Sequence, residues 1–378
     1  MKILVLGADG YIGWPLSLRL SSLGYDVRGL DNFVRRQRVQ DVGGNSVIPI
    51  ADFRIRSNIV EIMTGNMKYL PSLQGYDVIV HLAEQPSAPF SMRDVGSCWE
   101  TVNQNVLGTI NLLWRMREQC PDAHLVKLGS MGEYGTPDCV IPEGIIPEEC
   151  IAYYMDVGNY NKCVMKGLQF PKQPGSFYHL SKVFDSQAIE FACRAWGLRS
   201  TDTMQGIVFG TRTSDIDHAD KATRFDYDQY FGTVINRFCV QAVLGIPLTV
   251  YGGGYQKRGF LPLKDSIECL TLAIQNPPDT GEYRVFNQFA MTQTVNQVAF
   301  SVGSVANKMG LKPHIENVGN PRVENEKNYY EPKHDRLKAL GYEPKWSLSK
   351  EIQGVLEDLI PHKYHINRKV IYPTTTWK

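Results

Sequence analysis

The sequence predicts an α/β protein: a doubly wound parallel sheet with a smaller, discontinuous α/β domain attached to it. Two observations indicate this class. In the first half of the chain, short runs of apolar and β-branched residues alternate with segments whose apolar residues recur at helical spacing. The short runs are continuously apolar, which is typical of parallel strands that are buried on both faces.

The predicted elements follow one another in a regular order. A strand is expected over residues 3–7, and a helix over 12–23 follows it, with Gly24 placed to end the helix. Further strands are expected at 26–30, 77–83, 124–129 and 200–209. A helix over 105–119 separates the third of these five strands from the fourth.

The alternation breaks between residues 136 and 174, where prolines and a polar stretch interrupt it. A long irregular insertion in a compact domain is usually functional or mobile. The later part of the chain is less regular, so we predict a first domain over 1–205 and a second mainly over 206–378. Segments near 231–246 and 266–289 are expected to return to the first domain.

Composition argues against several classes of protein. The 40 Lys and Arg residues balance the 39 Asp and Glu residues, for a formal net charge of +1. This balance disfavours a protein built around nucleic acid. No apolar run approaches the roughly 18 residues that a membrane helix needs. The chain opens directly on a predicted strand, so we expect no targeting segment and a cytoplasmic location.

The cysteines give no sign of a metal site. Eight are present, none of them in a CxxC pair, and their spacing matches no zinc pattern. We interpret them as scattered reduced thiols. Cys139, Cys150 and Cys163 fall in the irregular stretch described above. No metal is therefore expected.

A glycine-rich turn after the first strand predicts a dinucleotide site on a Rossmann sheet. Residues 7–13 read GADGYIG, and such glycines let the backbone approach a pyrophosphate at the N-terminus of a helix. Asp31 ends the second strand, at the spacing where a carboxylate accepts from the adenosine ribose hydroxyls. Its charge favours NAD over NADP, although Arg35 and Arg36 beside it suit a 2′-phosphate.

A second motif predicts proton transfer. Tyr178 and Lys182 form a YxxxK pair whose side chains share one face of a helix. A Lys ammonium beside the phenol favours the phenolate, so we expect Lys182 to lower the pKa of Tyr178. Ser130 ends a predicted strand and is placed to bind the same substrate hydroxyl. This combination suits oxidation of a secondary alcohol by NAD.

These motifs resemble the extended short-chain dehydrogenases/reductases that act on nucleotide sugars. The matching stretches, which together cover nearly the whole chain, are GADGYIG, HLAEQ (81–85), NVLGTINLL (105–113), YHLSK (178–182), RGFLPLKD (258–265) and LGYEPKWSL (340–348). More particular stretches resemble the branch of this family that makes UDP-sulfoquinovose from UDP-glucose and sulfite: DNFVRR (31–36), SAPFSM (87–92) and NPRVE (320–324).

The resemblance implies a redox-neutral reaction. NAD oxidises C4 of the glucose, with Tyr178 as base, and the resulting ketone acidifies the C5 proton. That proton and the C6 hydroxyl are lost, sulfite adds at C6, and the hydride returns to C4. A second acid/base pair is needed, for which we expect Glu133 and His179. Met131 and Gly132 stand where 4,6-dehydratases of the family carry an acidic pair.

The resemblance also implies ligand contacts. The expected cofactor-binding residues are Gly7, Gly10, Tyr11, Ile12, Gly13, Asp31, Asn32, Arg35, Leu82, Asn105 and Lys182. The expected substrate-binding residues are Met131, Gln205, Asn236, Arg258 and Arg322. The two arginines would neutralise the diphosphate. A homodimer is expected through helices near 97–119 and 179–197.

Two alternative functions stay open. A UDP-sugar 4-epimerase or an atypical dehydratase fits almost as well, because Pro86 stands where the family pattern has an arginine and residues 138–170 depart in composition. A Rossmann protein that only senses NAD(H) is least favoured, since such a module could dispense with Tyr178 and Lys182.

Overall fold

The computed structural model describes residues 1–146, 168–216, 219–322 and 330–377. Its centre is a seven-stranded sheet in the order β13-β9-β5-β4-β1-β2-β3, with every neighbouring pair parallel. The strands are β1 (Lys2–Leu6), β2 (Asp26–Asp31), β3 (Glu61–Thr64), β4 (Val78–His81), β5 (His124–Ser130), β9 (Arg199–Gln205) and β13 (Tyr283–Gln288). The predicted doubly wound sheet is confirmed.

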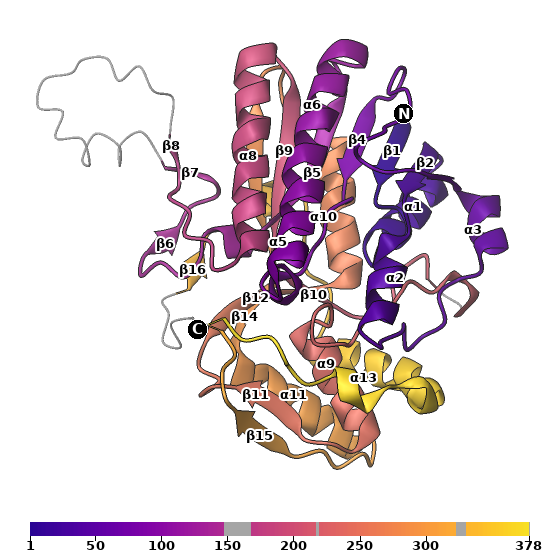
Figure 1. Cartoon of the computed structure of the whole chain (residues 1–378), viewed down its shortest axis with the longest axis vertical. Helices are drawn as coiled ribbons and strands as arrows, with labels where there is room; N and C mark the ends of the chain where they lie inside the picture. The colour runs from indigo at the N-terminus through magenta and orange to yellow at the C-terminus, as the bar shows by residue number, and fades with distance from the viewer. Residues whose placement is uncertain (147–167, 217–218, 323–329, 378) are drawn as a thin grey trace, which may run out of the picture.

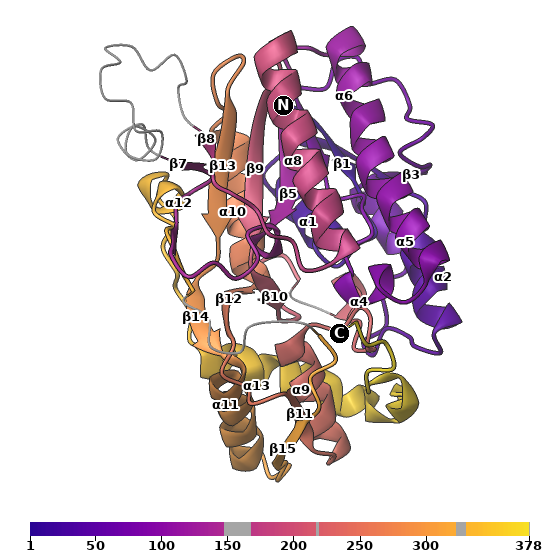
Figure 2. The same cartoon turned by 60° about the vertical axis from the view of Figure 1, so that its left-hand side comes forward.

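Helices cover both faces of this sheet (Figures 1 and 2). The helices of this larger unit are α1 (Gly13–Ser22), α2 (Val34–Asp41), α3 (Phe53–Ile59), α4 (Ala88–Ser91), α5 (Val95–Val102), α6 (Gly108–Gln119), α8 (Phe177–Trp196) and α10 (Leu263–Gln275). Ile3 and Val5 pack with α1 and α10, whereas Leu4 and Leu6 pack with α6 and α8. Successive residues of a strand face opposite sides, so one apolar run supplies both layers.

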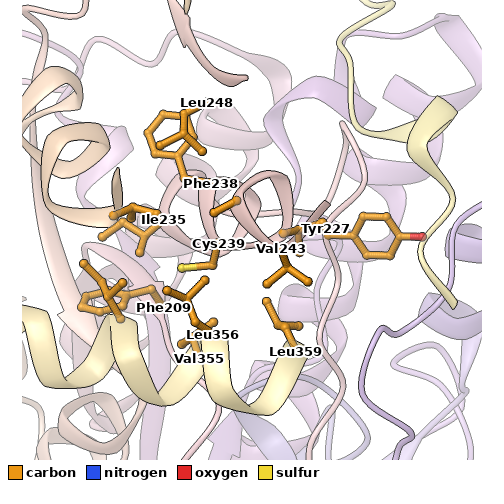
Figure 3. Packing of buried hydrophobic residues seen from close by; sticks show 14 of the residues in the cluster. Phe209, Tyr227, Ile235, Phe238, Cys239, Val243, Leu248, Val355, Leu356 and Leu359 are labelled. Carbon is orange, nitrogen blue, oxygen red and sulfur yellow. The ribbon is translucent and has the colours of Figure 1, made fainter. Parts of the chain in front are cut away.

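A smaller unit follows the sheet. It contains β10 (Ile207–Phe209), β11 (Leu248–Tyr251), β12 (Lys257–Pro262), β14 (Met291–Thr294), β15 (Ile315–Val318), α9 (Val234–Leu244), α11 (Val295–Lys308) and α13 (Leu348–Leu359). Strand β12 lies between β10 and β14, and β11 pairs with β15. Figure 3 shows the core, where Cys239 of α9 points towards Val355 and Leu356 of α13 and Phe238 points the other way, towards Leu248.

One expected return to the large sheet differs from the structure. Residues 266–289 do return, as most of α10 and the edge strand β13. Helix α9, within 231–246, instead packs among α11 and α13. Nearly every residue of α9 is buried, and periodicity alone does not tell which partner covers a helix that is buried on all sides. The boundary between residues 205 and 206 stays a prediction.

The irregular insertion pairs with a late segment of the chain. Strand β6 (Val140–Ile141) pairs with β16 (Glu331–Pro332), and β7 (Ile145–Ile146) pairs with β8 (Leu168–Gln169). Residues 147–167, with Cys150 and Cys163, lie outside the described residues. The six cysteines that are described are all free thiols.

Shorter helical turns complete the described chain. They are α12 (Arg336–Ala339), a π-helical segment (Asn103–Leu107) and 3₁₀ turns at Met131–Glu133, Ala219–Lys221, Ile360–His365 and Arg368–Val370. Across the described ranges, no helix combines the length and apolar character needed to cross a bilayer.

Candidate active site

The glycine-rich turn is fixed by close backbone contacts. Gly7 has φ +86°, and a Cβ there would lie 2.7 Å from the carbonyl carbon of Leu82. A Cβ on Gly13 would lie 2.0 Å from the oxygen of Gly7, and one on Gly10 would lie 3.1 Å from that same oxygen. Among the described residues no side chain caps the first turn of α1, which begins at Gly13. This cradle fits the pyrophosphate of NAD, because a tight backbone turn leads into a helix whose first N–H groups no described side chain caps.

Asp31 joins the end of β2 to this turn. Its Oδ2 accepts the backbone N–H of Asp9 at 2.8 Å, and its Oδ1 accepts that of Phe33 at 2.7 Å. Burial raises the pKa of Asp31, and the two N–H donors oppose the rise. The next residue, Asn32, is exposed and accepts from the N–H of Val34. Asp31 therefore lies where a carboxylate that binds the adenosine ribose is expected.

Two predicted ligands from distant segments meet beside the turn. The Tyr11 hydroxyl donates to the Gly210 carbonyl at 2.5 Å, and the Asn236 amide lies 3.4 Å from that hydroxyl. Asn236 also accepts the N–H of Gly210 at 3.0 Å. Asn236 thus braces the turn, and its expected role at the sugar phosphate stays a prediction.

Two further predicted cofactor residues have protein partners. Arg35 pairs with Asp226 at 3.0 Å. The fully buried Asn105 accepts the N–H of Gln85 at 2.8 Å and donates to the Ser181 hydroxyl at 2.9 Å. Asn105 therefore ties the loop after β4 to α8, next to Lys182.

Tyr178 and Ser130 meet, as the sequence predicts. Tyr178 lies in the first turn of α8, where its N–H donates to the Ser91 hydroxyl at 3.0 Å. Its side chain is hydrogen bonded to that of Ser130. Burial raises the pKa of Tyr178 to about 12, against a lowering influence from Lys127. The expected lowering by Lys182 is not what this arrangement gives, since desolvation outweighs the nearby positive charge.

Lys182 has a partner that the sequence did not suggest. Its Nζ forms a buried ion pair with Glu84 and donates to the carbonyl of Leu128 at 2.6 Å. The same Nζ lies 5.9 Å from the centre of the Tyr178 ring. Burial lowers the pKa of Lys182 to about 8. Glu84 follows the fully buried strand β4 by three residues, and a charge at that edge of a parallel sheet was the available signal.

His179 lies against Gly132, in the space that a side chain would otherwise take. A Cβ on Gly132 would come within 2.2 Å of His179 Nε2, while Nδ1 is hydrogen bonded to the Ser176 hydroxyl at 3.0 Å. Burial lowers the pKa of His179 to about 3, and the charges of Arg322 and Arg258 act in the same direction. The imidazole is therefore neutral near pH 7, with both predicted diphosphate arginines close enough to affect it.

Glu133 faces into the protein. It forms a capping box with Ser130, accepting its N–H at 3.1 Å. Its other oxygen accepts from Lys172 at 2.7 Å and from the Ser186 hydroxyl at 3.0 Å. Lys172, which sequence reasoning missed, comes from the end of the irregular stretch. Each carboxylate oxygen already has a donor, so the proton-transfer role of Glu133 stays a prediction.

The other predicted substrate residues occupy different surroundings. Met131 packs in an apolar cluster with Tyr134 and Met204. Gln205 accepts from the Ser266 hydroxyl at 2.6 Å, which ties the end of β9 to α10. Within the described ranges, no group of three or more His, Cys, Asp or Glu side chains is arranged to hold a metal ion.

Comparison with known proteins places this site in a family. The family model "NAD dependent epimerase/dehydratase family" matches residues 3–287. The chain therefore belongs to the NAD-dependent epimerase/dehydratase family, which contains extended short-chain dehydrogenases/reductases.

Within that family, its full-length relatives at 41–42% identity are UDP-sulfoquinovose synthases. The chloroplastic UDP-sulfoquinovose synthase of Spinacia oleracea is 42% identical over all of this chain and 79% of its own length. That of Sulfolobus acidocaldarius is 41% identical over all of this chain and 98% of its own length.

Solved structures share the fold. The UDP-glucuronic acid 4-epimerase of Bacillus cereus, in complex with UDP-glucuronic acid and NAD, gives a TM-score of 0.68 at 20% identity. That match covers 95% of this chain and 99% of the epimerase. The UDP-glucose 4-epimerase of Thermotoga maritima gives 0.69 at 21% identity, over 95% and 98% of the two chains. NAD is thus the cofactor of this family and fits the glycine cradle described above.

Proposed function

We propose that this chain makes UDP-sulfoquinovose from UDP-glucose and sulfite, with NAD as its cofactor. The observation that carries the proposal is the position of His179, whose ring packs against Gly132 and beside Tyr178. A carboxylate at position 132 would need the space that the imidazole fills. The arrangement thus disfavours the acidic pair of a 4,6-dehydratase and provides a neutral imidazole instead, in agreement with the synthase relatives.

Tyr178 and Ser130 handle the C4 hydroxyl. NAD, when bound, accepts a hydride from C4 and later returns it. The Ser130 hydroxyl orients the Tyr178 phenol, which takes the hydroxyl proton. Lys127 is buried behind the site and favours the phenolate, because a positive charge stabilises a negative one in a medium of low dielectric constant.

His179 serves the second pair of proton transfers. A neutral imidazole can accept the C5 proton and deliver one to the departing C6 hydroxyl, so that water leaves as the C5–H and C6–O bonds break. Bisulfite then forms the C6–S bond, and the proton that it gives up returns to C5 through His179. Arg258 and Arg322 lie near enough to act on His179, which supports their role at the adjoining diphosphate.

Mass spectrometry of one reaction tests the proposal. The purified chain receives UDP-glucose and NAD, with and without sulfite. A product with the mass of UDP-sulfoquinovose, formed only with sulfite, is expected. A UDP-hexose isomer or a 4-keto product that is insensitive to sulfite would contradict it and favour an epimerase or dehydratase.

The proposal includes a homodimer. Large apolar side chains are exposed on α5, α6 and α8: Trp99 is 75% exposed, Trp114 47%, Phe184 48% and Phe191 48%. These helices lie side by side on one face of the sheet. Such a surface suits a second copy of the chain. Light scattering coupled to size exclusion should give a dimer, and Phe184→Glu should shift it towards monomer. A monomeric parent chain would contradict this assignment.

A cytoplasmic location is also part of the proposal. It is supported by the free thiols of the six described cysteines, because reducing compartments keep thiols unpaired. Fractionation of the source cells tests it, and recovery in another compartment would contradict it.

A further inference from the structure

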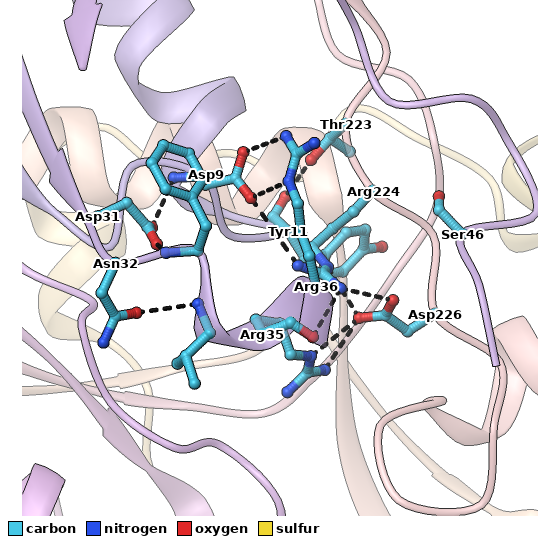
Figure 4. A network of polar contacts seen from close by, with 12 residues as sticks. Asp9, Tyr11, Asp31, Asn32, Arg35, Arg36, Ser46, Thr223, Arg224 and Asp226 are labelled. Carbon is cyan, nitrogen blue, oxygen red and sulfur yellow. Dashed lines mark hydrogen bonds and ion pairs between the residues drawn. The ribbon is translucent and has the colours of Figure 1, made fainter. Parts of the chain in front are cut away.

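A buried network of arginines and aspartates lies beside the glycine-rich turn, and the proposed reaction does not use it. Figure 4 shows the network between the turn, α2 and the connector that contains Arg224 and Asp226. Its two central carboxylates are nearly inaccessible, with Asp9 2% exposed and Asp226 7% exposed. A buried charge without a partner is energetically costly, so it is unfavourable for any of these side chains to leave the network.

Asp9 holds Arg36. The Arg36 Nε donates to Asp9 Oδ2 at 2.8 Å, and its Nη2 donates to Oδ1 at 2.6 Å. Two parallel charge-assisted bonds of this kind fix a guanidinium in position. Asp9 also pairs with the buried Arg56, and Arg224 Nη1 lies 4.0 Å from it.

Asp226 holds Arg35 in a comparable way. The Arg35 Nε and Nη2 both donate to Asp226 Oδ2, at 3.1 and 3.0 Å. The Arg35 guanidinium also lies 3.5 Å from the centre of the Phe231 ring. Both arginines that follow Asp31 in the sequence are therefore committed to carboxylates elsewhere in the chain.

Arg36 borders the expected ribose position. Asp31 accepts the N–H of Asp9. The hydrogen bonds that Arg36 donates to Asp9, together with the charges of Asp9 and Asp31, raise the pKa of Arg36. Arg36 thus lies close to both carboxylates. An arginine at this place is what commonly accommodates the 2′-phosphate of NADP.

We propose that Asp9 and Asp226 are specificity-determining residues: by holding Arg36 and Arg35, they keep both cations from a 2′-phosphate and make the chain reject NADP. To bind that phosphate, Arg36 would have to leave Asp9, whose buried charge would then be less well compensated. A 2′-phosphate would also meet the like charge of Asp31 without a free cation to offset it. This inference concerns the dinucleotide alone and does not depend on the identity of the sugar.

The test frees Arg36 without leaving a buried charge unbalanced. The double variant Asp9→Asn/Arg56→Met removes one buried charge of each sign. Isothermal titration calorimetry then measures the dissociation constants of NAD⁺ and NADP⁺ in the absence of sugar. The variant is expected to bind NADP⁺ at least about tenfold more tightly than the parent chain, with NAD⁺ affinity within about threefold. Unchanged NADP⁺ affinity in a variant that still binds NAD⁺ would overturn the proposal.

Arg36→Ala provides the matched control. Added to the double variant, it should abolish the gain for NADP⁺. In the otherwise unaltered chain it should leave NAD⁺ affinity within about threefold, because Asp9 already neutralises Arg36. A much larger loss of NAD⁺ binding there would also overturn the proposal. If the double variant does not fold, Asp226→Asn/Arg224→Met, which also removes one buried charge of each sign, applies the same criteria to Arg35.

Discussion

The cofactor half and the catalytic half of the site are built differently. Around the glycine turn, geometry is set by backbone: Gly7 and Gly13 have no room for a Cβ against Leu82 and against each other. Around Tyr178, geometry is set by buried side-chain pairs between distant segments, such as Glu84 with Lys182 and Lys172 with Glu133.

This difference has a practical meaning. A backbone constraint dictates a residue type at fixed spacing, so it is visible in the sequence. In a buried ion pair each charge can be removed separately. The contribution of each charge to activity can therefore differ in size, and it must be measured. The predictions below run from the largest expected effect to the smallest. The first three change the catalytic half, and the last changes a buried histidine outside it.

Removal of the Tyr178 hydroxyl should have the largest effect. Tyr178→Phe leaves no group to take the C4 proton, so we expect turnover to fall by about a thousandfold or more. NAD⁺ binding should stay within about threefold, because the glycine turn is untouched. Product formation measures the loss of turnover, and calorimetric titration measures the affinity for NAD⁺. Retained turnover would mean that a different base takes the C4 proton.

A methyl group on Gly132 should displace His179. Because a Cβ there would lie 2.2 Å from Nε2, we expect Gly132→Ala to reduce kcat by about a hundredfold. Gly175→Ala is the matched control, since a Cβ at Gly175 meets nothing within 4 Å. Equal kcat values for the two variants would mean that the position of His179 does not matter.

Neutralising Glu84 should have a smaller, pH-dependent effect. Without the carboxylate, the buried ammonium of Lys182 loses its ion pair, so the pKa of Lys182 should fall below its value of about 8. For Glu84→Gln we expect an approximately tenfold lower kcat and an alkaline limb of the pH–rate profile that moves to lower pH.

Glu190→Gln is the control for this change, because Glu190 belongs to an exposed pair with Arg194 on the same helix. It should leave the profile where it is. If Glu84→Gln also leaves the alkaline limb in place, Lys182 does not depend on Glu84.

Acid stability should show the smallest effect. Burial lowers the pKa of His124 to about 3, whereas an unfolded histidine titrates near 6.5. As pH falls from about 6.5 to 3, the unfolded chain binds a proton that folded His124 refuses, so folding loses stability, at up to about 1.4 kcal/mol per pH unit. His124→Gln should flatten this dependence in urea unfolding measured at pH 7 and pH 5. Parallel losses in both proteins would contradict the assignment.

Much of the fold follows from local sequence pattern. Continuous apolar strands and intervening helices predict the parallel sheet, and both the sheet and its NAD-binding family are confirmed. Helix α9 was assigned to the wrong neighbours, because burial on all sides does not name the partner. Its residues Ile235 and Phe238 pack with α11 and α13 rather than with the large sheet.

The site was predictable as a set of residue types but not as a set of contacts. Ser130 and Tyr178 could be paired in advance because each ends or begins an element at one edge of the sheet. Glu84 lies 98 residues from Lys182, and Lys172 lies 39 from Glu133. Nothing local links such charges, so only the folded chain reveals that burial raises the pKa of Tyr178 while Lys182 is occupied elsewhere.

Return of the same hydride to C4 is the most direct test of the central claim. The chain would receive UDP-glucose deuterated at C4, unlabelled NAD⁺ and sulfite, and the product would be analysed by mass spectrometry. The account predicts UDP-sulfoquinovose that retains the deuterium at C4, because the site takes and returns one hydride within a single turnover. A sulfonated product without deuterium, or conversion of the substrate into a different UDP-sugar that contains no sulfur, would contradict it.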